Sequence, residues 1–95
     1  MNQMSKEVPK AISKIAKSPT LEITLRIGKD GITEPVLSEL VDQLKRRVLV
    51  KVKANKSISS DRKNRQQMFS EISERAGSTL VFQRGNVAVF WRTSL

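Results

Sequence analysis

The stretch LEITLRIGKDGITEP, residues 21–35, contains the clearest indications of the fold. Its first seven residues alternate strictly between apolar and polar side chains, a pattern typical of a half-buried β-strand. The leucines and isoleucines at 21, 23, 25 and 27 are therefore expected on one face of a sheet. Glu22, Thr24 and Arg26 are expected on the other face.

This strand leads into a loop with two glycines, Gly28–Gly31, and then into a helix that begins near Thr33. Glycine lets the backbone bend tightly and leaves room for a close ligand. Thr33 is expected to cap the helix, whose unpaired N–H groups favour a phosphate. A GxxG motif alone is more often a simple turn, and Asp30 and Glu34 oppose an anion. The loop is therefore expected to position a ligand more than to attract it.

A helix and a second strand are predicted after the loop. The helix runs to about Lys45 and has an apolar stripe made of Val36, Leu37, Leu40, Val41 and Leu44. Valines at 48, 50 and 52 alternate with other residues and indicate a strand. A strand–helix–strand unit implies two parallel strands joined by a right-handed crossover.

The remaining segments complete the predicted fold. Residues 9–18 predict a short helix with an apolar side that docks on the core and lysines on the opposite side. A third helix, capped by Ser59 or Ser60, is expected to end at Gly77, with a thin apolar stripe at 68, 69, 72 and 76. Strands 79–84 and 87–92 form a hairpin around Gly85-Asn86.

The predicted order of elements is therefore αβαβαββ. We expect an α/β two-layer sandwich, with a four-stranded mixed sheet and the helices on one sheet face. One domain spans residues 1–95, and residues 1–8 are expected to be disordered.

Charge is the strongest indication of function. The chain has a formal net charge of +9 and a pI near 10.5, which predicts binding to a polyanion. Lys45–Arg65 holds nine basic residues and one acid, Asp61, a net charge of +8. A charge run is often only a solvated face, but one this uneven costs self-repulsion. Nucleic acid is therefore the expected partner. An anionic membrane is ranked lower, since the lysine-rich helix is short and contains no aromatic residue.

Composition argues against several other functions. The absence of cysteine excludes disulfides and thiolate metal sites and indicates a reducing compartment, which we expect to be the cytoplasm. The absence of histidine removes the commonest general base. No apolar stretch approaches the length of a membrane span or a signal peptide core. The acids are scattered, and the loop lacks the length and the Lys-Ser/Thr pair of a Walker phosphate loop. We expect no enzyme activity, cofactor, metal or small-molecule substrate.

The candidate RNA-binding residues combine the glycine loop with the basic positions near it and after it. Aromatic residues for base stacking are few, and of the neighbours Phe90 and Trp91, one is expected in the core, with Trp91 favoured as the covered one. Binding is therefore expected to depend on charge and shape. The predicted site residues are Arg26, Gly28, Lys29, Asp30, Gly31, Lys45, Arg46, Arg47, Lys51, Lys53, Lys56, Arg62, Lys63 and Arg65.

The segment Ile27–Glu34 resembles the signature of the CRM domain (chloroplast RNA splicing and ribosome maturation), also called YhbY-like. The similarity continues through Val50–Val52, Ala76–Gly77 and Arg84–Val89 to Arg92, in the family's order of elements. The resemblance implies a fold similar to the C-terminal domain of bacterial translation initiation factor three. It also implies RNA binding, with the GxxG loop on the RNA surface.

Two features depart from the family pattern. Residues 55–59 are rich in lysine and serine, and Trp91 stands where we expect tyrosine. Single-domain members are associated with the precursor of the large ribosomal subunit, and multi-domain relatives act in organellar intron splicing. The leading hypothesis is a monomer that binds structured RNA, most simply ribosomal RNA during large-subunit assembly.

Three alternatives remain open at this stage. An Alba-like chromatin protein that binds duplex DNA or RNA would have a related fold, but such proteins extend a long hairpin arm, for which Gly85-Asn86 leaves no room. A splicing factor would use the same RNA surface on a different target. A ribosome-associated protein-interaction module would dock on protein instead of RNA.

Overall fold

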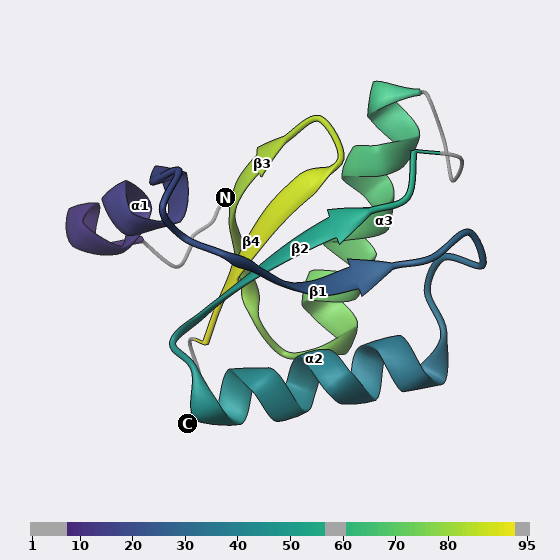
Figure 1. The fold of residues 1–95 in the computed structure, drawn as a ribbon, viewed down its shortest axis with the longest axis horizontal. Coiled ribbons are helices and arrows are strands. Elements are labelled where there is room, and N and C mark those ends of the chain that lie inside the picture. The colour runs from purple at the N-terminus through teal and green to yellow at the C-terminus, as the bar shows by residue number, and fades with distance from the viewer. Residues whose placement is uncertain (1–7, 57–60, 93–95) are drawn as a thin grey trace.

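Figure 1 shows the computed structural model, which describes residues 8–56 and 61–92. The disorder expected for residues 1–8 falls, except at Val8, outside the described residues. The predicted order of elements, αβαβαββ, is confirmed. The elements are α1 (Lys10–Lys17), β1 (Ile23–Ile27), α2 (Glu34–Arg46), β2 (Leu49–Ala54), α3 (Arg62–Arg75), β3 (Thr79–Arg84) and β4 (Val87–Trp91).

The strands form one mixed sheet in the order β1-β2-β4-β3. β1 and β2 are parallel, as predicted, and the other two pairs are antiparallel. Consequently β1, β2 and β3 all end on one side of the molecule, where β4, α2 and α3 begin (Figure 1). We call this side the glycine-loop end. It comprises residues 26–33, 53–56, 61–65 and 84–87.

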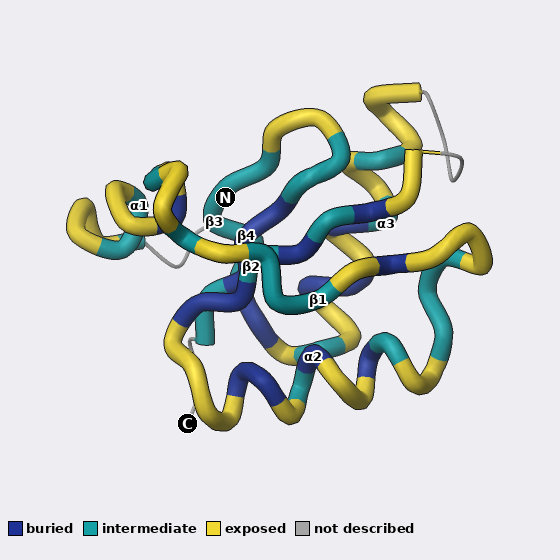
Figure 2. Tube along the Cα trace, viewed as in Figure 1, coloured by how far each residue is buried: buried dark blue, intermediate teal, exposed yellow. Residues whose placement is uncertain are grey.

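The main core lies between the sheet and the two longer helices, and Figure 2 shows the buried positions of α2 turned toward the sheet. Phe69 of α3 and Phe90 of β4 are both fully buried, with ring centroids 6.3 Å apart and planes tilted by 59°. Offset or tilted aromatic pairs of this kind add to the stabilisation from buried area. The other buried members are Ile27, Leu37, Leu40, Leu44, Val50, Val52, Ala54, Ile72 and Ala88. Both predicted helical stripes therefore face the sheet.

The short helix α1 lies on the opposite face of the sheet. Its buried Ala16 clusters with Leu49 and Val89, whose chain neighbours Val50 and Phe90 point into the main core. Successive residues of a strand point to opposite faces, so α1 and the α2–α3 layer must lie on different sides. The expectation that the helices share one face therefore holds for α2 and α3 and is wrong for α1. The sequence shows that one side of α1 is apolar and must be buried. The same pattern would result whichever face of the sheet the helix packed on.

Helix ends follow the predicted chemistry with one change. Thr33 caps α2, since its Oγ1 accepts a hydrogen bond from the backbone N–H of Val36 at 3.3 Å. The N-cap of α3 is Asp61, whose Oδ1 accepts from the N–H of Lys63 at 2.9 Å. Ser59 or Ser60 was the predicted cap, and both lie outside the described residues. Gly77, with φ +64°, ends the helix as predicted.

Strand β1 does not keep the strict alternation of its sequence. Its register against β2 shifts between Ile23 and Leu25. Thr24, predicted on the polar face, donates its hydroxyl to Oε1 of Gln43 in α2 at 2.6 Å. The Nε2 of Gln43 donates to the carbonyl of Thr24 at 2.9 Å, which satisfies an amide that is only 6% exposed. This pair links α2 to the sheet across the main core.

Candidate nucleic-acid interface

The two glycines of the loop have different structural roles. Gly31 has φ +74°, a left-handed conformation that L-residues rarely adopt, and its N–H donates to the carbonyl of Gly28 at 3.0 Å. Gly28 has no positive φ, and a Cβ built there would meet nothing within 4 Å. The fold therefore requires glycine at 31 and does not require it at 28. Gly28 instead leaves an exposed stretch of backbone open to close approach from outside.

The charged side chains around the loop include both signs. Lys29 and Asp30 are both exposed at the loop. Glu34, the other acid expected to oppose a phosphate, lies with its Oε2 3.5 Å from Nη2 of Arg75. The same guanidinium contacts Oε2 of Glu71 at 3.1 Å, and both pairs are exposed and screened by solvent, so it offsets only a small part of the charge of Glu34.

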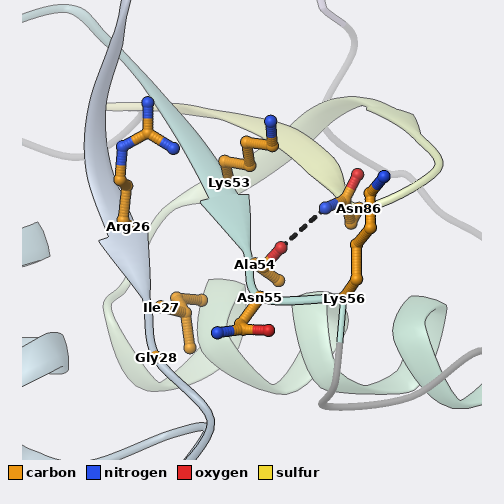
Figure 3. Close-up of a pocket in the computed structure, with 8 residues that line it drawn as sticks. All are labelled: Arg26, Ile27, Gly28, Lys53, Ala54, Asn55, Lys56 and Asn86. Carbon is orange, nitrogen blue, oxygen red and sulfur yellow. Dashed lines mark hydrogen bonds between the residues drawn. The ribbon is translucent and has the colours of Figure 1, made fainter.

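Basic side chains from three strands lie in one row across the sheet. Arg26 of β1 pairs in register with Lys53 of β2, Lys53 with Val87 of β4, and Val87 with Arg84 of β3. Figure 3 shows Arg26 and Lys53 side by side on the same face. At a strand spacing of about 4.8 Å, the Cα atoms of Lys53 and Arg84 lie roughly 10 Å apart. We call Arg26, Lys53 and Arg84 the sheet row.

Arg84 was absent from the predicted site, and the sequence supplied only part of the information needed to find it. The two-residue Gly85-Asn86 turn pairs Arg84 with Val87 across the hairpin. Val87 lies on the face opposite its buried neighbour Ala88, and Arg84 must share that face. Only the order of the strands, which places β4 beside β2, was needed to align Arg84 with Lys53.

Three predicted cations lie at the start of α3. Arg62 and Lys63 are exposed in its first turn, next to the hairpin. The Nε of Arg65 donates to the carbonyl of Gly85 at 3.2 Å and thereby holds the helix against the β3–β4 turn. Arg65 thus has a structural role, and Arg62 and Lys63 are the cations that α3 presents at the glycine-loop end.

The remaining predicted cations lie elsewhere. Lys45, Arg46 and Arg47 lie at the far end of α2, roughly 20 Å from the glycine loop at 1.5 Å per residue (Figure 1). The Nζ of Lys51 donates to the carbonyl of Leu21 at 3.1 Å, so it secures the segment between α1 and β1. The basic run that is continuous in sequence is therefore divided between two ends of the molecule.

The aromatic side chains offer little for base stacking. Phe69 and Phe90 are fully buried, whereas Phe82 and Trp91 are partly buried and pack beneath α1. The preference for Trp91 over Phe90 as the covered residue is wrong. Phe90 points toward the larger helical layer, and Trp91 points toward the short helix, which covers less of the sheet. Contacts with a ligand at the glycine-loop end would therefore be polar.

Within the described residues, no group of three or more acidic side chains is placed to hold a metal ion. In the same part of the chain, no helix is long and apolar enough to cross a membrane.

The sequence and the fold were each compared with those of known proteins. The family model of the CRS1/YhbY (CRM) domain matches residues 4–92. The chain belongs to the CRM domain family. Its structure is also similar to the solution structure of the hypothetical protein SAV1595 from Staphylococcus aureus, for which RNA binding is the proposed activity. The TM-score is 0.71 at 26% sequence identity, over 87% of this chain and 85% of that one. No curated protein matches the chain significantly.

In this CRM domain, the motif that suggested the family and the cations around it lie at one end of the molecule. The cations that the glycine-loop end presents are Arg26, Lys29, Lys53, Lys56, Arg62, Lys63 and Arg84, all of them exposed except Lys53, which is partly buried. Arg26, Lys53 and Arg84 form the sheet row on its sheet face.

Proposed function

We propose that this CRM domain is a non-catalytic RNA-binding module that contacts structured RNA through its glycine-loop end. The observation that carries the proposal is the convergence of seven cations around a backbone segment left open at Gly28. They come from β1, the glycine loop, β2, the turn that follows β2, α3 and β3. Cations supply attraction to phosphates, and the open backbone of the loop can meet an RNA backbone closely. The patch formed by Lys45, Arg46 and Arg47 is too far away to share one compact contact with it.

The RNA target we propose is ribosomal RNA during assembly of the large subunit. This assignment rests on the resemblance to single-domain family members associated with that precursor. A splicing role would use the same surface. Either role makes the protein a partner of an RNA that is already folded, because the site is broad and lacks exposed aromatic rings.

Binding of a structured ribosomal RNA fragment in competition with duplex DNA tests the proposal. With about six phosphates neutralised, RNA affinity should fall about 10³-fold or more between 50 and 200 mM salt. A preference for duplex DNA would instead favour an Alba-like role. In cell extract, the protein should sediment with large-subunit precursors and be released by nuclease. Retention after nuclease treatment would indicate docking on protein.

A further inference from the structure

A hollow of about 410 Å³ opens between the ends of β1 and β2 (Figure 3). Its lining contains Arg26, Lys53 and Lys56 as cations, the side-chain amide of Asn86, and no carboxylate from the described residues. The volume lies within the roughly 300–1,000 Å³ typical of small-ligand sites. An anionic group of about nucleotide size would fit its charge and size.

Hydrogen bonds hold the walls of this hollow in place. The N–H of Asn55 donates to the carbonyl of Ile27 at 2.8 Å, which ties the ends of β1 and β2 together. The N–H of Ala54 donates to the carbonyl of Asn86 at 2.8 Å, and Nδ2 of Asn86 donates back to the carbonyl of Ala54 at 2.7 Å. Asn86 is therefore fixed before a ligand arrives, which lowers the entropic cost of binding.

The fixed orientation of Asn86 leaves Oδ1 as a hydrogen-bond acceptor. Figure 3 shows this oxygen turned away from Ala54, on the side toward which the Lys53 and Lys56 side chains extend. Among the described residues, the hydrogen bonds of the Asn86 side chain use Nδ2 alone. Oδ1 and the oxygens of a bare phosphate are both hydrogen-bond acceptors, so they cannot bond to each other even though three cations lie nearby. This arrangement suits a ligand that brings a donor next to its phosphate, as the 2′-hydroxyl of a ribonucleotide does.

We infer that the hollow binds one ribonucleotide of an RNA strand. Arg26, Lys53 and Lys56 contact its phosphate, and Oδ1 of Asn86 accepts a hydrogen bond from its 2′-hydroxyl. The inference rests on the proposed RNA binding and assigns the discrimination of RNA from DNA to one side chain. Donors on the bases are common to RNA and DNA, so the sugar is the group to test.

The experiment compares two strands of one sequence that folds into a hairpin, one RNA and one with 2′-fluoro in place of each 2′-hydroxyl. The fluoro strand lacks the donor. By fluorescence anisotropy, the wild-type protein should bind RNA about 3- to 10-fold more tightly, the effect of one hydrogen bond. Asn86→Ala should bind both strands within about 2-fold of each other, mainly through lost RNA affinity. Lys56→Gln, the matched control, should weaken both strands alike.

Equal affinity of the wild type for the two strands would overturn the inference, and so would a folded Asn86→Ala protein that keeps the wild-type ratio. Both results leave RNA binding intact. Failure of the wild type to bind any RNA would overturn the proposed function itself. If Asn86→Ala fails to fold, NMR of the Asn86 side-chain amide in the wild-type protein tests the contact with the 2′-hydroxyl instead. The resonances of this amide should shift when RNA is added and should not shift when the fluoro strand is added. Equal shifts with both strands would refute the contact between Asn86 and the 2′-hydroxyl.

Discussion

The glycine loop allows folding and RNA binding to be separated by two single substitutions. A Cβ at position 28 would meet nothing within 4 Å, and the backbone there has no positive φ. Replacing glycine at a site that tolerates a side chain stabilises a protein by about 0.4–1 kcal/mol. In a domain of this size, Gly28→Ala should therefore raise Tm by roughly 2–8 °C.

Gly31→Ala should have the opposite effect on folding. With φ at +74°, a side chain at position 31 costs about 1–2 kcal/mol, which lowers Tm by roughly 4–16 °C. If RNA backbone approaches the loop at Gly28, the added methyl of Gly28→Ala displaces at least one charge-assisted hydrogen bond. RNA affinity should then fall about 10-fold or more, since such bonds contribute about 1.5–3 kcal/mol.

Thermal unfolding followed by circular dichroism, together with anisotropy titration of a structured RNA, gives both quantities for each variant. Gly28→Ala should thus be more stable than the wild type and bind RNA less tightly. A Gly28→Ala protein that is folded and binds RNA within about 2-fold of the wild type would refute the positioning role of the loop.

Three further predictions concern charges placed in different parts of the fold. Lys53→Gln should lower RNA affinity and reduce the salt slope by about 0.7–0.9, whereas Lys14→Gln on α1 should change neither; equal effects would remove the sheet row from the interface. Replacing both Arg46 and Arg47 by Gln removes two charges but should change the affinity for a short RNA by less than about 3-fold. A 10-fold loss of affinity would mean that RNA reaches the far end of α2. Arg92→Gln should lower the free energy of unfolding by about 1–2 kcal/mol in urea and leave RNA affinity unchanged.

The prediction for Arg92 comes from a contact that the sequence does not reveal. Its Nη1 donates to the carbonyls of Leu44 and Lys45 at 3.2 Å each, so the residue that follows β4 supplies a cap for the end of α2. The Nε of the same guanidinium is buried without a partner among the described residues, which offsets part of the gain. Unchanged stability of Arg92→Gln would show that the two effects cancel.

Sequence patterns predicted the elements well because periodicity and caps are local properties. Thr33, Gly77 and the Gly85-Asn86 turn all act through neighbours a few residues away, and each lies where its chemistry requires. The face on which α1 packs depends instead on which side of the sheet is still open. Amphipathicity alone does not contain that information.

The candidate site shows the same limit. Charge counted along the chain groups Lys45 with Lys53, but α2 and β2 run antiparallel and carry them to opposite ends of the molecule. Arg84 was missed because it is far from the basic run in sequence and joins Lys53 only through the pairing of β4 with both β2 and β3. Long-range strand order, which periodicity does not encode, decides which charges act together.

Mapping the RNA contact by NMR tests the central claim most directly. Titration of a structured ribosomal RNA fragment into the ¹⁵N-labelled protein should shift the amide resonances of residues 26–31, 53–56, 62–65 and 84–87. Those of residues 38–47 should remain unchanged. Shifts concentrated in residues 38–47, or spread evenly over the surface, would show that the glycine-loop end is not the RNA-binding surface.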